Sequence, residues 1–162
     1  MGSFRLFNAG LGRLLSKAWR RWCHYMFREL ARQIISHEQS PERLPQDVAA
    51  SAVRIYATWL TGLSAILGET GSSALFRRSL RLSEVTYPLF STVRNATAET
   101  LLSALGTCLD AQRAEVAHEA AVELLAIHLE LLTTLIGQRL TEQLVRDIWP
   151  DLSIPTREER YA

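Results

Sequence analysis

The chain has 162 residues, of which 48% are hydrophobic and 22% are charged. This length and balance suit a single globular domain with its own core, and they exclude a disordered or collagen-like chain. The net charge of +1 is unevenly distributed: residues 1–35 carry seven basic residues and one acid, whereas residues 36–162 carry eleven basic and sixteen acidic residues. Such segregation indicates either that the two parts meet different surfaces or that each neutralises the other.

The pattern of apolar residues is helical throughout. Apolar residues recur every three or four positions, and no stretch alternates as a half-buried strand would. We therefore predict an all-α bundle of four to six helices, up-and-down, with one long central helix. Residues 1–162 are expected to form one domain, with a basic amphipathic helix over 1–36, a helical core over 37–150 and a loosely held tail over 151–162.

The first predicted helix, from about Phe4 to Ser36, carries the strongest functional signal. It combines an apolar stripe with flanking basic residues, and such helices bind acidic proteins, anionic membranes or nucleic-acid backbones. A structural alternative is that the arginines face the acidic remainder of the same chain. The expected contact residues are Arg13, Lys17, Trp19, Arg20, Arg21, Trp22 and Arg28.

The next predicted helix runs from about Pro45 to Leu67, since proline suits a first helical turn. Residues 68–73 are rich in glycine and serine and predict a turn, after which a third helix reaches about Tyr87. Pro88 then predicts either a stop or a kink. An anion site is conceivable where the third helix opens, because its first amides would lack helical partners. Its residues would be Ser72, Ser73, Arg77 and Arg78.

Membrane insertion and secretion are not expected. The stretch from Val48 to Gly68 comes nearest to a membrane span, but Arg54 and small polar residues interrupt it. Basic residues also break the apolar run that a secretory signal needs near the first residue. The isolated cysteines, Cys23 and Cys108, suggest neither a zinc module nor a disulfide framework. We expect a cytoplasmic protein, with peripheral membrane attachment as the alternative.

The last third of the chain predicts a helix with Leu101 to Leu109 on its apolar face, and a final helix that stops near Trp149. Between them, the polar stretch 110–115 is compatible with a turn or with a continuous rod over 97–136. Residues 122–136 are apolar on more than one face, which predicts a homodimer through this helix. The expected interface residues are Leu125, Leu129, Leu132 and Ile136.

No residue pattern predicts catalysis, a metal or another cofactor. Glu115 and His118 form one ExxH pair, but a di-iron bundle needs two. No nucleophile elbow or P-loop is present. His128 lies in the most apolar segment, where it could line a small-molecule or haem pocket, although a satisfied core histidine is the simpler interpretation.

The expected function is therefore that of a non-enzymatic helical adaptor or dimerising regulatory protein, as in bacterial signalling. Two alternatives remain from the same residues. One is a small-molecule or haem-type sensor with a pocket near His128. The other is a peripheral membrane or nucleic-acid binder that uses the basic first helix.

Overall fold

The fold is seen in a computed structural model, which describes residues 4–39 and 48–154. Within these ranges the protein is an all-α bundle of six α-helices and one short 3-10 helix, without strands, as the sequence predicts. Of the side chains before Cys23, those of Lys17 and Arg21 are described. The elements are α1 (Phe4–Glu38), α2 (Val48–Ser83), η1 (Pro88–Phe90), α3 (Ser91–Arg94), α4 (Leu101–Asp110), α5 (Ala114–Ile136) and α6 (Gln138–Ile148).

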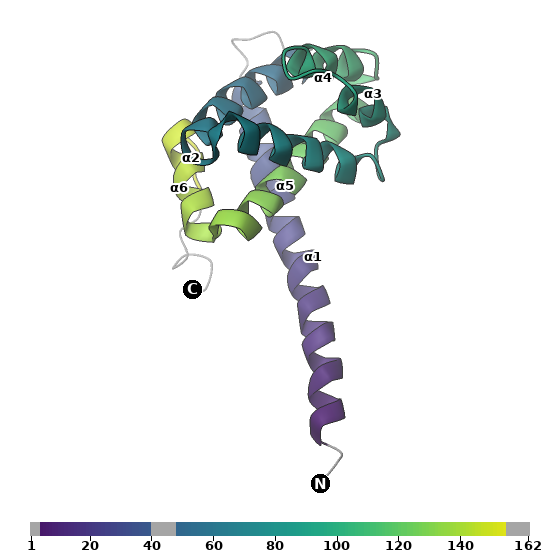
Figure 1. Ribbon diagram of the computed structural model, residues 1–162, viewed down its shortest axis with the longest axis vertical. Helices are drawn as coiled ribbons and strands as arrows, with labels where there is room; N and C mark the ends of the chain where they lie inside the picture. The colour runs from purple at the N-terminus through teal and green to yellow at the C-terminus, as the bar shows by residue number, and fades with distance from the viewer. Residues whose placement is uncertain (1–3, 40–47, 155–162) are drawn as a thin grey trace.

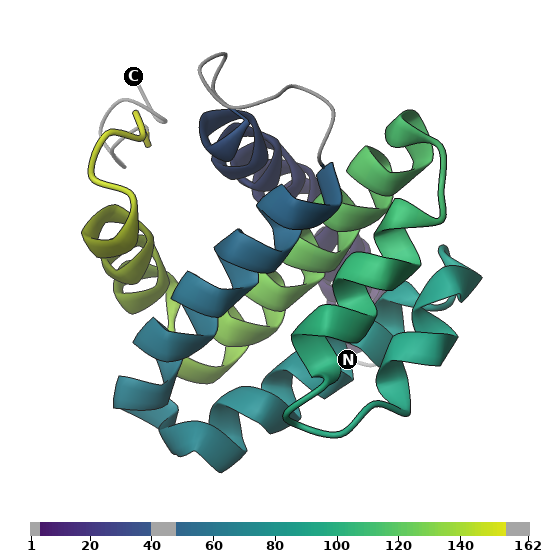
Figure 2. The same ribbon diagram turned by 90° about the horizontal axis from the view of Figure 1, so that it is seen from above.

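Helix α5 lies at the centre of the bundle and packs against α1, α2, α4 and α6 (Figures 1 and 2). Its residues 120–126 are all buried, because alanines let neighbouring helices approach while Leu124 and Leu125 fill the space between them. A helix that is apolar on most of its faces is stable only when it is surrounded in this way.

Helix α2 consists of two helical halves that meet at a sharp kink, and the sequence likewise predicted two helices here, separated by a turn. Its bend lies at Gly68, whose φ of 73° and ψ of 165° are readily adopted only by glycine. The residues predicted to form the turn after Gly68 are helical instead.

The sequence left two possible helix breaks open, at Pro88 and over residues 110–115, and the structure has a break at each of them. Helix α2 ends at Ser83, and Pro88 opens η1. The helix therefore ends before the proline and does not continue through a kink. Arg113 has an extended backbone (φ −63°, ψ 147°) between α4 and α5. This excludes a continuous rod over residues 97–136.

Gly137 separates the last two helices. Its φ of 89° and ψ of 158° end α5 and turn the chain into α6. Helix α6 stops at Ile148, and Trp149 is buried with its ring stacked on Trp59 at a centroid distance of 5.6 Å. Beyond it, Leu152 and Ile154 pack against the core, so the described part of the predicted loose tail is held to the body.

Helix α1 has two halves with different surroundings. Its second half buries Phe27, Ala31, Ile34 and Ile35 in the core. Its first half extends beyond the rest of the molecule (Figure 1). At 1.5 Å per residue the whole helix is about 52 Å long, which exceeds the width of a compact body of this size.

Helix α2 is also long and apolar enough to cross a membrane, by length and composition alone. In the described chain it is the one helix that meets this test, with a mean hydropathy of 1.2 in its most apolar window, 33% of which is buried. It packs against α5 and α4 and bends at Gly68. The core helix of a globular protein has the same properties.

Candidate functional site

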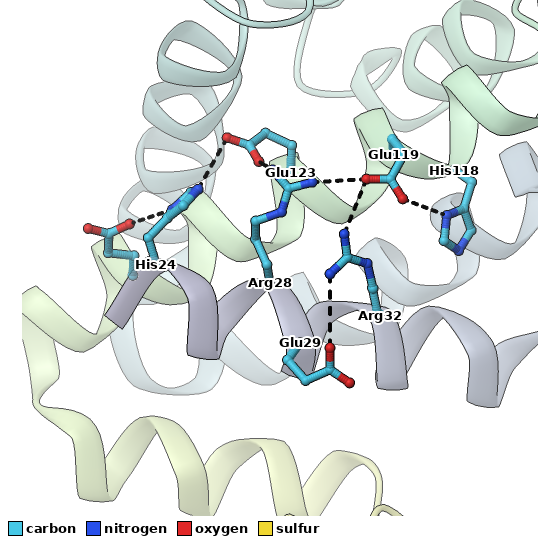
Figure 3. A network of polar contacts seen from close by, with 8 residues as sticks. His24, Arg28, Glu29, Arg32, His118, Glu119 and Glu123 are labelled. Atoms are coloured by element: carbon cyan, nitrogen blue, oxygen red, sulfur yellow. Dashed lines mark hydrogen bonds and ion pairs between the residues drawn. The ribbon is translucent and has the colours of Figure 1, made fainter. Parts of the chain in front are cut away.

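The candidate site lies where α1 leaves the body, along its contact with α5. Glu119, Glu123 and Glu130 are three to four residues apart or a multiple of this, so they share one face of α5. On α1, Arg28 and Arg32 are one turn apart and lie opposite this acidic face (Figure 3). The two helices therefore meet through opposite charges.

Arg28 is the centre of this contact. Its guanidinium donates from Nη1 to Oε2 of Glu123 at 2.7 Å and from Nη2 to Oε2 of Glu119 at 2.9 Å (Figure 3). Glu123 is only 5% exposed. A carboxylate buried to this extent needs a charged partner, because transfer of an unpaired charge out of water is costly. Arg28 therefore fixes where α1 sits on α5.

Two weaker contacts flank Arg28. Arg32 donates to Oε2 of Glu119 at 3.4 Å, and its side chain is 38% exposed. One turn before Arg28, His24 places Nδ1 3.3 Å from Oε2 of Glu130 and Nε2 3.6 Å from Oε1 of Glu123. We call the contact of Arg28 with Glu119 and Glu123 the clamp, and these two contacts extend it to both sides. Each contributes less energy than the Arg28 ion pairs because solvent screens it more.

A shallow surface pocket of about 390 Å³ lies beside the clamp. It is lined by Arg21, His24, Tyr25, Arg28 and Glu130. The ring of Tyr25 is largely in solvent, at 68% exposure. The pocket thus combines cationic groups with an exposed aromatic ring at the root of the projecting half of α1.

The predicted contact residues of the first helix fall into three groups. Arg28 binds the chain's own acids, as the structural alternative proposed for the arginines. Lys17 and Arg21 are exposed, and no ion pair joins either to an acid within the described ranges. The remaining four lie outside the described side chains; they are Arg13, Trp19, Arg20 and Trp22.

The residues predicted to form an anion site do not come together at a helix start. Ser72 lies inside α2, and its buried hydroxyl donates to the carbonyl of Leu60 at 3.3 Å. Arg77 donates to the carbonyls of Arg94 and Ala96 at 3.0 and 2.8 Å. Ser73 is helical as well, and Arg78 is exposed away from any helix start. The second half of α2 opens earlier, at Gly68, so neither serine caps a helix start.

The residues predicted to form a dimer interface have their own place in the core. Leu125, Leu129 and Leu132 are 0–1% exposed within the single chain, so a second copy would not reach them. Ile136 is half-buried against the core. The apolar side chains left exposed near this end of α5 are Leu135 and Leu140, at 61% and 59%. A dimer stays a prediction, and a contact at this end of α5 would involve such residues.

His128 is fully buried among aromatic rings. Tyr56, Trp59 and Phe76 surround it with ring centroids 6.0 to 6.3 Å away. The hydroxyl of Ser79 donates to the Leu75 carbonyl at 3.0 Å, so Nδ1–H of His128 donates to Ser79 Oγ at 2.9 Å. Burial lowers the pKa of His128 to about 3. The histidine is therefore neutral at physiological pH.

Three buried polar atoms around this ring have no hydrogen-bond partner: His128 Nε2, Tyr56 Oη and Trp59 Nε1. Buried polar groups are nearly always paired, so a group of three marks an unusual part of the core. The sequence pointed to His128 alone. Tyr56 and Trp59 are helix-spaced aromatics, and nothing in their spacing distinguishes them from ordinary core residues.

No family model, curated protein or solved structure matches this chain. Its function is therefore argued from its own side chains.

Metal-binding chemistry finds no support in the described ranges. No group of three or more histidine, cysteine or acidic side chains is close enough there to hold an ion. His118 of the ExxH pair contacts Glu119 at 3.6 Å instead (Figure 3).

Proposed function

We propose that this protein is a non-enzymatic helical interaction protein, in which the body holds α1 and the first half of α1 meets a partner. One observation carries the proposal: Arg28 clamps α1 onto α5 through Glu119 and Glu123, while the helix runs on beyond the body (Figure 1). A clamp at the root gives a long helix a fixed direction. This arrangement suits presentation of a surface to another molecule.

The backbone of the first half of α1 extends beyond the body (Figure 1). Most of the stability of a helix in a protein comes from tertiary packing, and the body does not extend along this half. Lys17 and Arg21, the two described side chains before Cys23, are exposed. The sequence of this half is nevertheless rich in large apolar residues, which a helix in water would not favour. A partner that covers them would account for both features.

Photo-crosslinking in cells tests the proposal. A photoreactive amino acid would replace Arg21 on the projecting half or, as a matched control, Arg139 on the exposed surface of α6. We expect an adduct, to protein or to lipid, from position 21 and much less from position 139. Equal yields at the two positions would argue against α1 as the contact surface.

A second candidate function is a small-molecule sensor at His128. The observation that favours it is the group of three unpaired polar atoms on His128, Tyr56 and Trp59. These offer one acceptor and two donors, which suits a small polar ligand better than haem, because His128 is 0% exposed and packed among three aromatic rings. Native mass spectrometry of the purified protein would show a retained small molecule as a mass increment.

A further inference from the structure

We infer that the partner of α1 is an anionic lipid surface, on which the first half of the helix lies flat. This inference rests on the proposed function, since it names the partner that the projecting half would meet. Its first support is charge. Residues 1–22 contain five basic residues and no acidic one. Such a segment is attracted to a surface of opposite sign and repelled by a cationic one.

The second support is the kind of apolar residue in the same segment. Phenylalanine, leucine and tryptophan recur there every three or four positions, beginning with Phe4 and Phe7 and reaching Trp19 and Trp22. A helix with this composition and with arginine or lysine as its polar residues is typical of helices that lie in the membrane interface, where the apolar residues enter the acyl boundary. The charge of the headgroups then meets the basic residues.

The third support comes from the described side chains at the root of this half. Lys17, Arg21 and Tyr25 follow one another at single-turn spacing and are all exposed. A tyrosine ring beside basic residues is favoured at headgroup depth, because one end of the ring is apolar and the other is polar. Arg21 and Tyr25 also line the shallow surface pocket of about 390 Å³, where Glu130 lies beside them, so the exposed ring and guanidinium, and not the pocket itself, would meet the headgroups.

A second copy of the chain is a poorer occupant. The acids that match the basic residues of α1 are Glu119, Glu123 and Glu130, and the chain's own His24, Arg28 and Arg32 already contact them. In a neighbouring molecule, this acidic face of α5 would likewise be occupied by that molecule's own basic residues. Nucleic acid would satisfy the cations, but it would leave the large apolar residues in water.

Vesicle flotation tests the inference with the full chain. The probes are vesicles of phosphatidylcholine alone and of equal parts phosphatidylcholine and phosphatidylserine. One variant, called the arm variant because its changes lie in the projecting first half of α1, carries Arg13→Gln, Lys17→Gln, Arg20→Gln and Arg21→Gln. The matched control carries Arg78→Gln, Arg81→Gln, Arg113→Gln and Arg139→Gln, which remove the same charge from exposed positions of the body.

We expect the parent and the control to float with the anionic vesicles and not with the neutral ones. The arm variant should partition at least a hundredfold less, since each basic residue near an anionic surface contributes about fivefold. Tryptophan emission should shift to the blue on binding, and the shift would come from Trp19 and Trp22 because Trp59 and Trp149 are already buried.

Three results would overturn the inference. They are no flotation of the parent, equal flotation with neutral vesicles, and an equal loss for the control and arm variants. Binding of duplex DNA by the parent in place of vesicles would also overturn it, in favour of a nucleic-acid partner. In each of these cases, a photo-crosslink from position 21 to a protein or nucleic acid in cells would still support the proposed function.

Discussion

At the scale of single residues, the position of α1 depends on how a buried carboxylate is neutralised. Glu123 is 5% exposed, and Arg28 donates to it at 2.7 Å while also holding Glu119. The sequence indicated Arg28 as a contact residue, because basic residues flank the apolar stripe. It did not indicate Glu119 or Glu123 as the partners. These acids lie 91 and 95 positions after Arg28 in the sequence, and helical periodicity does not predict contacts over such a separation.

Replacement of Arg28 by methionine should therefore be costly. The Glu123 carboxylate would lose its charged partner, and we expect the free energy of unfolding to fall by roughly 2 to 3 kcal/mol. This lies at or below the usual range for buried pairs because a quarter of the Arg28 side chain is exposed (26%). Urea denaturation followed by circular dichroism measures the effect.

The control for this prediction is Arg32→Met, one turn along the same helix. Arg32 is more exposed and contacts Glu119 at 3.4 Å, so its loss should cost less than about 1 kcal/mol. If the two variants were equally stable, Arg28 would not be the residue that fixes α1 on α5.

The second prediction at this scale concerns pH and His128. Burial lowers the pKa of this histidine in the folded protein to about 3, whereas an unfolded histidine has a pKa of about 6.5. The unfolded chain therefore binds the proton first as the pH falls. The stabilising contribution of neutral His128 is complete above about pH 6.5 and is lost as the pH falls toward 3, by up to about 1.4 kcal/mol per pH unit.

Unfolding free energies at pH 7.5 and pH 5 would check this prediction. Other groups titrate in the same interval, so the comparison is between the parent and His128→Gln, which lacks the imidazole. We expect a smaller loss between the two pH values in the variant. An identical loss in both proteins would mean that His128 does not carry this pH dependence.

At the scale of elements, the sequence predicted helices better than it predicted their joints. The first helix, expected over Phe4–Ser36, is α1 (Phe4–Glu38), because its apolar period is unbroken. The joint in α2 was placed over residues 68–73, whereas Gly68 alone makes the bend. Several glycines and serines in a row give the same composition signal, but the structure needs a positive φ at only one of them.

Gly137 makes a testable joint of the same kind. It has a φ of 89° with no atom within 4 Å of an added Cβ, so a side chain would meet backbone strain and not a steric clash. We expect Gly137→Ala to lower the free energy of unfolding by roughly 1 to 3 kcal/mol, the usual cost of this conformation outside glycine. Thermal denaturation measures it, with the exposed Thr134→Ala as a control near zero. If Gly137→Ala left the free energy of unfolding unchanged, α5 and α6 would be able to join in another conformation.

At the scale of the whole molecule, the uneven charge of the sequence has two structural counterparts. The second half of α1 pairs with acids of α5 in the same chain, whereas the first half extends away from the body, and its two described basic side chains, Lys17 and Arg21, are exposed. Neutralisation within the chain thus applies to the second half of the helix, and contact of the first half with another surface stays a prediction. The sequence could not show where the first gives way to the second, because the basic residues continue without a change of spacing from one half into the other.

Self-association is the last prediction at this scale. The sequence argument relied on surplus apolar residues of α5, but Leu132 is buried in the chain's own core at 0% exposure. The exposed residues Leu135 and Leu140 now stand at the α5–α6 joint as the apolar surface that a symmetric copy could cover. We expect the parent to sediment as a dimer at tens of micromolar and Leu135→Arg to sediment as a folded monomer. Leu132→Arg should instead lose its helical circular dichroism, because a buried charge without a partner is incompatible with the core. A monomeric parent would contradict the dimer, and a Leu135→Arg variant that stays dimeric would place the contact elsewhere.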